Sequence, residues 1–327
     1  MIKLNTNECP YPPSPLVARA AEQLDTGRLR LYPDPVAADL IRAWAKEKGL
    51  EEDQVFPGVG SDDVLSMCFL AFFASGKPVL FPDITYSFYD VWCDVYRIPF
   101  ETRPLNGDFE IEPEDYIGGD PGGIVIATPN APTGRKLPLE AIERIVSSNP
   151  GCVVIVDEAY VDFGASSAVS LIGKYDNLAV VQTFSKSRAM AGMRIGFAMG
   201  DAQLIKYLND VKYSVNSYTM SYPAIALGCA AISDREYFEK TVAKICATRE
   251  RTAERLRELG FSFPDSSANF IFARHEKKSG REIFEELRNR NIFVRRWDRD
   301  RIADHLRITI GTDEQMDALF AALEEIL

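Results

Sequence analysis

The sequence has few histidines and no paired cysteines, which limits the metal sites that it could build. Its 327 residues include two histidines, His275 and His305, and six cysteines, none in a Cys-x-x-Cys pair. Because protein zinc sites are built mainly from these two residue types, no metal centre is expected. Several of the cysteines lie in apolar stretches, where a reduced thiol behaves as a small hydrophobic group, and this usage predicts a cytoplasmic protein.

The sequence also lacks an excess of basic charge and any long apolar run. Asp and Glu number 48 against 37 Lys and Arg, which gives a net charge of -11. Nucleic acids and anionic membrane surfaces attract basic proteins, so neither is expected as a partner. Apolar runs such as 153–156 are too short to cross a bilayer. A small anionic substrate is compatible with this composition, because a local group of arginines can oppose the overall field.

Short aliphatic runs alternate with helical segments through the middle of the chain. This alternation predicts an α/β fold with a mostly parallel central sheet covered by helices. The runs are nearly continuous in aliphatic residues, as expected for strands that are buried on both faces. We expect strands at residues 77–82, 123–128, 152–156, 178–184 and 194–200.

The two ends of the chain predict a smaller α+β domain. Residues 1–45 are proline-rich and then helical, and dense charge at helical spacing predicts a long exposed helix at 237–259. We therefore expect a large domain at 46–235 and a small domain made of 1–45, which includes an N-terminal arm, and 236–327. Within the last segment we expect strands at 269–273, 292–296 and 305–310 and helices at 280–290 and 313–326.

Polar residues recur where the predicted strands end, which is where open α/β sheets bind their ligands. Asp157 directly follows a run of four aliphatic residues. A carboxylate in that position needs a cationic or hydrogen-bonding partner. Asp157 is therefore either a cap for the next segment or the counter-charge of a protonated ring nitrogen or a metal.

Two other segments carry groups that suit a phosphate. The loop at 58–63 reads Gly-Val-Gly-Ser-Asp-Asp before an apolar helix, so free backbone N–H groups could face an anion, although a plain helix cap is the alternative. The hydroxyls of Thr183 and Ser185 with the guanidinium of Arg194 would make a phosphate cradle near the amine of Lys186. Pyridoxal phosphate is one cofactor that uses a lysine, an aspartate and a phosphate cup together.

The motifs Asp-Glu-Ala-Tyr, Thr-Phe-Ser-Lys, Ala-Gly-x-Arg-x-Gly and Asn-x-Pro-Thr-Gly resemble those of the pyridoxal-phosphate-dependent aminotransferases with the aspartate-aminotransferase fold. The similarity runs from residue 3 to the C-terminus. A narrower resemblance, to the histidinol-phosphate aminotransferases, rests on the segments LNTNECPYPPSP, LYPDP, GVGSDD, PDITYSFY, VIVDEAYVDF, FVRRW and LRITIGT.

The resemblance implies roles for individual residues around the cofactor. Lys186 would form the Schiff base and move protons, Asp157 would pair with the ring nitrogen, and Tyr160 would bond the ring oxygen. At position 131 this chain has alanine where the family has asparagine, so that contact falls to Asn130 or to Tyr160 alone. The remaining cofactor residues implied are the stacking Tyr86 and the phosphate cup of Gly60, Ser61, Asp62, Thr183, Ser185 and Arg194.

The resemblance also implies a homodimer and a substrate pocket. Tyr32 would reach the cofactor phosphate of the neighbouring subunit, although it could simply be a turn aromatic. Arg307 would clamp an α-carboxylate and Arg295 would contact a substrate phosphate, unless Arg295 belongs to a solvated basic edge. Tyr11 and Asn216 would line the same pocket, with simple packing as the alternative for Tyr11.

The implied activity is the exchange of an amino group between L-histidinol phosphate and 2-oxoglutarate in histidine biosynthesis. An aromatic amino acid aminotransferase or a threonine-phosphate decarboxylase would use the same scaffold. A non-catalytic regulatory module that binds the same cofactor is a remote alternative, because the acidic chain has no basic helix-turn-helix segment.

Overall fold

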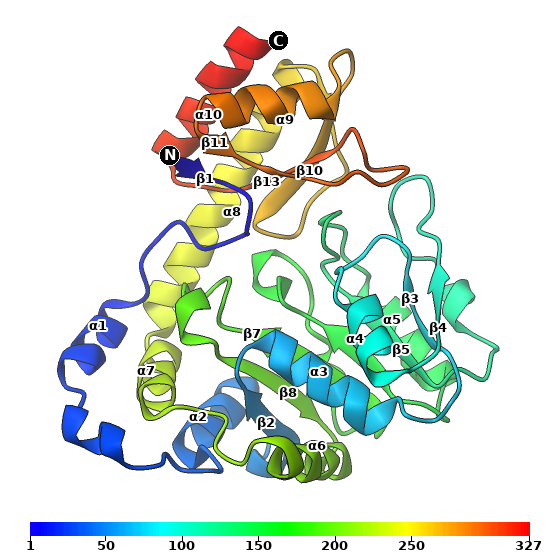
Figure 1. The fold of residues 1–327 in the computed structure, drawn as a ribbon, viewed down its shortest axis with the longest axis vertical. Coiled ribbons are helices and arrows are strands. Elements are labelled where there is room, and N and C mark those ends of the chain that lie inside the picture. Colours follow the sequence, from blue (N-terminus) through cyan, green and yellow to red (C-terminus); the bar gives the residue numbers. More distant parts are fainter.

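A seven-stranded sheet forms the centre of the protein in the computed structural model, which describes residues 1–327. Its strand order is β2-β8-β7-β6-β5-β3-β4, and it occupies the lower part of Figure 1. The strands, in spatial order, are Val55–Gly58 (β2), Gly196–Gly200 (β8), Leu178–Thr183 (β7), Val154–Asp157 (β6), Gly123–Ala127 (β5), Val79–Pro82 (β3) and Phe100–Arg103 (β4).

The predicted α/β fold with a mostly parallel sheet is confirmed. Only β8 runs against its neighbours, β2 and β7, while the other adjacent pairs are parallel. All five predicted strands are present, but β2 and β4 were not expected. β2 contains Pro57 and Gly58, and β4 is a largely exposed edge strand with Glu101 and Arg103, so neither has the aliphatic run of a central strand.

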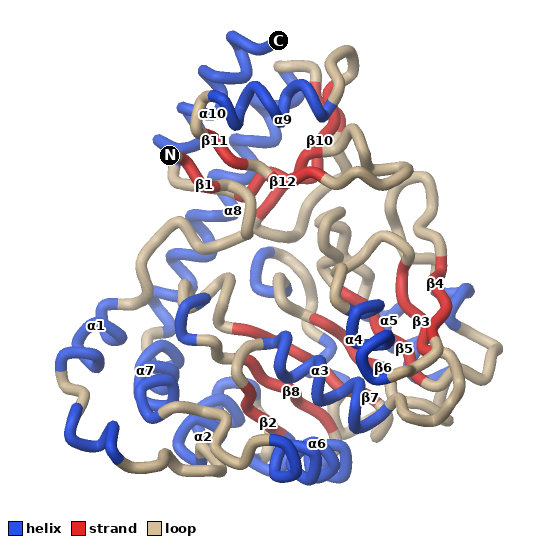
Figure 2. The backbone as a smooth tube through the Cα atoms, viewed as in Figure 1, coloured by secondary structure: helices blue, strands red, loops and turns tan.

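Helices cover both faces of this sheet, as Figure 2 shows. Alternate strand residues point to opposite sides, so Ile124 and Ile126 join one buried cluster while Val125 joins another. The first cluster includes side chains of Ala38–Lys48 (α2), Leu139–Ser148 (α5) and Tyr222–Ser233 (α7). The second includes side chains of Ser61–Phe72 (α3), Tyr89–Tyr96 (α4) and Ala202–Val215 (α6).

A smaller antiparallel sheet, β12-β13-β10-β9, lies above the first. Its strands are Arg295–Arg296 (β12), Leu306–Thr309 (β13), Phe270–His275 (β10) and Phe261–Ser262 (β9). A third, two-stranded sheet joins Ile2–Lys3 (β1) to Ile292–Phe293 (β11) in parallel. The helices of this part are Arg235–Glu258 (α8), Gly280–Asn289 (α9) and Asp313–Ile326 (α10).

Two details of this upper part differ from expectation. The strand expected at 292–296 is divided at Val294, because β11 pairs with β1 whereas β12 pairs with β13. Pro15–Glu22 (α1) and α2 contact α7, and Val17 and Leu40 belong to the core cluster of the large sheet. The two-domain division stays a prediction, and this packing favours a first boundary before Pro15 rather than at residue 46.

None of the α-helices combines the length and apolar character needed to cross a lipid bilayer.

The N-terminal segment connects the two parts of the molecule. It begins at β1 in the upper part, where it pairs with β11, and descends to α1 in the lower part (Figure 1).

Gly196, at the start of β8, tests how tightly the sheet packs against the loop before α3. A Cβ at this position would lie 2.5 Å from both Gly60 C and Ser61 N, which are backbone atoms and cannot move independently. We expect Gly196→Ala to lower the free energy of unfolding by about 1–3 kcal/mol. Gly151→Ala, where a Cβ meets nothing within 4 Å, is the control in the same urea titration, and an equal loss in both variants would contradict this packing.

Candidate active site

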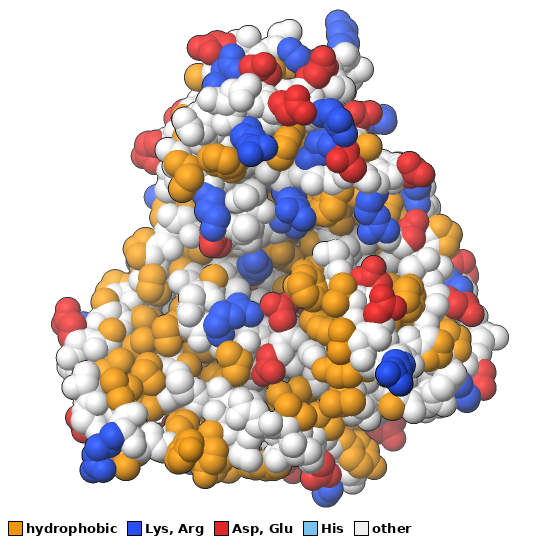
Figure 3. All heavy atoms as spheres, viewed as in Figure 1, with side chains coloured by type: hydrophobic (Ala, Val, Ile, Leu, Met, Phe, Trp, Pro, Cys, Tyr) orange, Lys and Arg blue, Asp and Glu red, His pale blue; other side chains and the backbone are white.

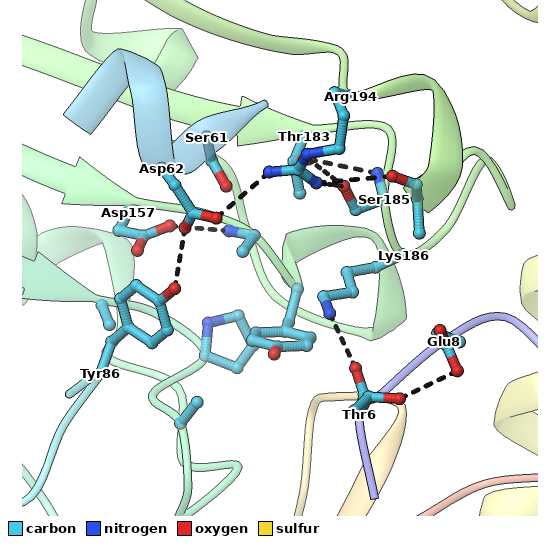
Figure 4. A pocket seen from close by; sticks show the side chains of 16 residues that line it. Thr6, Glu8, Ser61, Asp62, Tyr86, Asp157, Thr183, Ser185, Lys186 and Arg194 are labelled. Carbon is cyan, nitrogen blue, oxygen red and sulfur yellow. Dashed lines mark hydrogen bonds and ion pairs between the residues drawn. The ribbon is translucent and has the colours of Figure 1, made fainter. Parts of the chain in front are cut away.

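A cavity lies at the carboxyl ends of β5, β6 and β7, where the lower part of the molecule faces the upper part. Figure 3 shows the hollow between the two parts, with basic side chains along its upper rim. Nine of the residues expected around a cofactor line this cavity (Figure 4): Ser61, Asp62, Tyr86, Asp157, Tyr160, Thr183, Ser185, Lys186 and Arg194. No cluster of His, Cys, Asp or Glu side chains in the chain could hold a metal ion.

The amine of Lys186 points into the middle of this cavity (Figure 4). Its Nζ donates a hydrogen bond to the carbonyl oxygen of Thr6, 3.1 Å away, and lies 5.7 Å from the ring centre of Tyr160. Thr6 belongs to the N-terminal segment, 180 residues away in sequence. The amine therefore makes a single hydrogen bond, to a backbone carbonyl oxygen, and faces a cavity that can admit a small molecule.

Asp157 ends the central strand β6, and its side chain is almost completely buried, with 6% of the residue exposed. The Tyr89 hydroxyl donates to its Oδ2 at 2.7 Å, and the Ala159 N–H donates to its Oδ1 at 3.1 Å. Burial raises the pKa of Asp157 to about 6, although both hydrogen bonds act in the opposite direction. A cation bound beside this carboxylate would recover the cost of its desolvation.

The other end of the cavity is suited to an anion. The N-cap residue of α3 is Gly60, which has no side chain to cap the helix, so the first N–H groups of α3 are available, and Gly60 itself has a φ of +87°. The Arg194 guanidinium contacts the Asp62 carboxylate at 3.2 Å and the Ser185 hydroxyl at 3.3 Å. A Cβ on Gly60 would lie 2.4 Å from Arg194 Nη2 and would displace this guanidinium, and the positive φ independently favours glycine here.

A second cavity adjoins the first on the side of the small sheet, and Tyr86, Tyr160 and Lys186 line both. It contains Arg295 and Arg307, which are direct cross-strand partners on β12 and β13. Arg307 donates to the carbonyl oxygen of Asn5 at 2.9 Å, but its buried Nε has no partner. Burial lowers the pKa of Arg307. Two guanidiniums side by side repel unless an anion lies between them.

Comparison with known proteins identifies the family. The sequence model of the family described as "Aminotransferase class I and II" matches residues 1–323. The chain belongs to the class I and II aminotransferase family. The aminotransferase fold expected from the sequence motifs is thereby confirmed.

Individual relatives of this aminotransferase are similar over nearly their whole length. It is 51% identical over 328 residues to histidinol-phosphate aminotransferase 1 of Bordetella parapertussis, covering 100% of this chain and 92% of the relative. It is 52% identical over 327 residues to a histidinol-phosphate aminotransferase of a Marinomonas species, covering 99% and 93%. A crystal structure of the Sinorhizobium meliloti histidinol-phosphate aminotransferase in complex with pyridoxal-5'-phosphate superposes with a TM-score of 0.91 at 25% identity, covering 99% and 90%.

The cofactor of this aminotransferase is pyridoxal phosphate, and the residues present fit that group. The unneutralised Asp157 suits a protonated ring nitrogen, and the uncapped start of α3 with Arg194 suits a phosphate. Lys186 lies between these two ends of the cavity. The role of each residue stays a prediction.

Five of the expected residues do not line either cavity, and one of them is Gly60, the N-cap residue of α3. Asn130 is committed elsewhere: its amide nitrogen donates to Ile84 O and Thr133 Oγ1, and its amide oxygen accepts from Thr85. The geometry therefore favours Tyr160 over Asn130 as the ring-oxygen donor. The other three are Tyr11, whose ring packs against the small-sheet core, and the exposed Tyr32 and Asn216.

The structure also adds residues that the motifs did not single out. Tyr89, three positions after Tyr86 in the same segment, holds Asp157. Asn5, Thr6 and Asn7 line the second cavity from the N-terminal segment. They lie inside LNTNE, a motif that was recognised as a family feature but carried no local chemical pattern pointing to an active site.

The pH dependence of stability tests the burial of Asp157. Its folded-state pKa is raised, so the stability it contributes is full below pH 4 and is lost as pH rises through about 6. Asp157→Asn removes this titration. In the cofactor-free protein we expect the variant to gain roughly 2–3 kcal/mol relative to the parent between pH 4 and pH 7.

Urea unfolding at the two pH values measures this difference. The buried Glu158 also has a raised pKa, but its contribution is the same in both proteins and cancels when they are compared. A difference in stability that is the same at both pH values would contradict a desolvated Asp157.

Proposed function

We propose that this protein transfers the amino group of L-histidinol phosphate to 2-oxoglutarate, the transamination step of histidine biosynthesis. The observation that carries the proposal is the pair of arginines, Arg295 and Arg307, in the cavity next to Lys186. Identity of about half over the full length with histidinol-phosphate aminotransferases supports it.

The chemistry of the two amino donors explains why two arginines are useful. In glutamate the carbon that bears the amine also bears a carboxylate, whereas in histidinol phosphate it bears a CH2–O–phosphate group. Arg307, the more buried of the pair, would hold either anion, and Arg295 would add a second fork of donors for the larger dianion. A planar guanidinium suits both groups because it donates two parallel hydrogen bonds.

Pyridoxal phosphate, when bound, supplies a ring that takes up the electron pair left when the Cα–H bond of the amino substrate breaks. Lys186 Nζ would remove the proton from Cα and return it on the cofactor side. Asp157 would keep a proton on the ring nitrogen, and the Tyr160 hydroxyl would donate to the ring oxygen. The carbonyl oxygen of Thr6 holds the amine of Lys186 at 3.1 Å.

A substrate panel distinguishes this activity from the related ones. We expect kcat/KM for histidinol phosphate to exceed that for phenylalanine by about 100-fold or more, because only the phosphate engages both arginines, and no CO2 release from threonine phosphate. Spectra of single half-reactions and a CO2 assay measure these quantities. A preference for phenylalanine, or decarboxylation of threonine phosphate, would replace the proposal with one of the alternatives.

Arg295→Ala provides an internal control within the same panel. Loss of this guanidinium should reduce kcat/KM for histidinol phosphate at least tenfold more than for glutamate. An equal loss for both donors would argue against selective contact with the phosphate.

A cytoplasmic homodimer is part of the proposal. All six cysteines are free thiols, which suits a reducing compartment. Tyr32 is 82% exposed and stacks only on Tyr218, with ring centres 4.6 Å apart. Other large apolar side chains of the same two segments are also exposed: Leu29, Leu31, Val215 and Tyr218. Figure 3 shows hydrophobic side chains gathered on the lower left of the molecule, and an exposed apolar surface of this kind suits contact with a second copy.

Mixed dimers test whether Tyr32 serves the partner's site. Lys186→Ala and Tyr32→Ala homodimers should each lose activity, the second through weaker cofactor binding. In a mixed dimer one site has both defects and the other has neither, so about half of the activity per site should return in the mixed species. Activity of tagged, purified mixed dimers measures this, and no recovery beyond the sum of the parents would contradict a shared site.

A further inference from the structure

The N-terminal segment Asn5–Asn7 accepts hydrogen bonds through three successive carbonyl oxygens, two of them from side chains that line the cavities, Arg307 and Lys186, and one from the buried Asn269. Asn5 O accepts from Arg307 Nη2 at 2.9 Å, Thr6 O accepts from Lys186 Nζ at 3.1 Å, and Asn7 O accepts from Asn269 Nδ2 at 3.0 Å. The contact between Thr6 and Lys186 is drawn in Figure 4. This segment therefore ties residues of the large sheet and the small sheet to one short stretch of chain.

Asn7 is the most constrained residue of this segment. It is 1% exposed and has a φ of 56°, in the left-handed region that asparagine tolerates better than most residues. The Thr309 hydroxyl accepts from the Asn7 backbone N–H at 3.1 Å and donates to Asn7 Oδ1 at 2.9 Å. These two bonds fix the carboxamide with its oxygen toward Thr309.

The amide nitrogen of Asn7 consequently faces Tyr160. Asn7 Nδ2 donates to the Tyr160 hydroxyl oxygen at 2.9 Å, and this is the only hydrogen bond that the hydroxyl makes. Because the oxygen acts as acceptor toward Asn7, the hydroxyl hydrogen must point elsewhere, and Tyr160 lines both cavities. No neighbouring amide can substitute, since position 131 is alanine and Asn130 is committed to Ile84 and Thr133.

We propose that Asn7 is a positioning residue that forces Tyr160 to donate its hydroxyl hydrogen into the cofactor site. The proposal rests on the proposed contact between Tyr160 and the cofactor ring oxygen. In this chain the side chain that orients the ring-oxygen donor comes from the N-terminal segment rather than from the loop at 130–134. Asn7 acts through Tyr160 and touches no reacting atom.

The test is the pH titration of visible absorbance in the protein with pyridoxal phosphate bound. Asn7→Asp keeps the shape and the left-handed backbone but replaces the donor with an acceptor, so Tyr160 would turn its hydrogen toward Asp. The ring oxygen then loses a hydrogen bond, becomes more basic and retains the neighbouring proton to higher pH. We expect the midpoint to rise by about one pH unit, toward the midpoint of Tyr160→Phe.

A double-mutant cycle separates this mechanism from a structural one. In the Tyr160→Phe background, Asn7→Asp should leave the midpoint unchanged, because the group through which it acts is absent. Asn7→Gly, which also tolerates the backbone conformation, removes the donor without adding charge and should give a smaller rise that likewise disappears with Phe at position 160.

Each other outcome has a distinct meaning. An Asn7→Asp shift that persists in the Tyr160→Phe background, no shift in Asn7→Asp, or a Tyr160→Phe variant with the parent midpoint would each overturn the positioning role. Failure of the parent protein to develop visible absorbance with pyridoxal phosphate would instead reject the proposed function. Melting temperatures of the same variants show whether a lost shift reflects unfolding.

Discussion

The buried carboxylate of Asp157 is the constraint on which the rest of the site depends. It ends the central strand of a sheet covered on both faces, where water cannot neutralise it and where only Tyr89 and a backbone N–H hold it. Burial of a charge without a partner is costly, so this position favours a ligand that brings its own proton or positive charge. The protonated ring nitrogen of the cofactor would supply this positive charge next to Asp157.

Groups that favour an anion lie at two other places in the site. Arg194 and the uncapped start of α3 suit the phosphate of the cofactor, whereas Arg295 and Arg307 suit the anion of the substrate. The first group lies beside the large sheet, just before β8 and just after β2, and the second lies on strands β12 and β13 of the small sheet. An acidic protein with a net charge of -11 thus presents cationic groups where anions must bind, through local placement and not through its overall charge.

The sequence predicted the central strands because 154–157 and 178–183 are aliphatic runs with little ambiguity. It could not predict the edge strand β4, whose exposed residues carry no burial signal, or the division of 292–296, which depends on pairing with β1 from the far end of the chain. The residues that line the cavity could be predicted because they follow strand ends in recognisable motifs.

The residues of the site that sequence reasoning missed share one property: their roles depend on tertiary contacts. Asn7 lies 153 residues from Tyr160 and 302 residues from Thr309, so no local pattern reveals their hydrogen bonds. Asn130 illustrates the reverse case, since a motif position that suggested a cofactor contact is fully occupied by neighbouring side chains and backbone.

We expect Lys186 to carry the cofactor between a counter-charge at Asp157 and an anion cup at Arg194. Reduction of the pyridoxal-phosphate-loaded protein with borohydride, followed by peptide mass spectrometry, tests it most directly. We expect one pyridoxyl phosphate adduct per chain, on the peptide that contains Lys186. An unmodified Lys186, or a stable adduct on a different lysine, would contradict it.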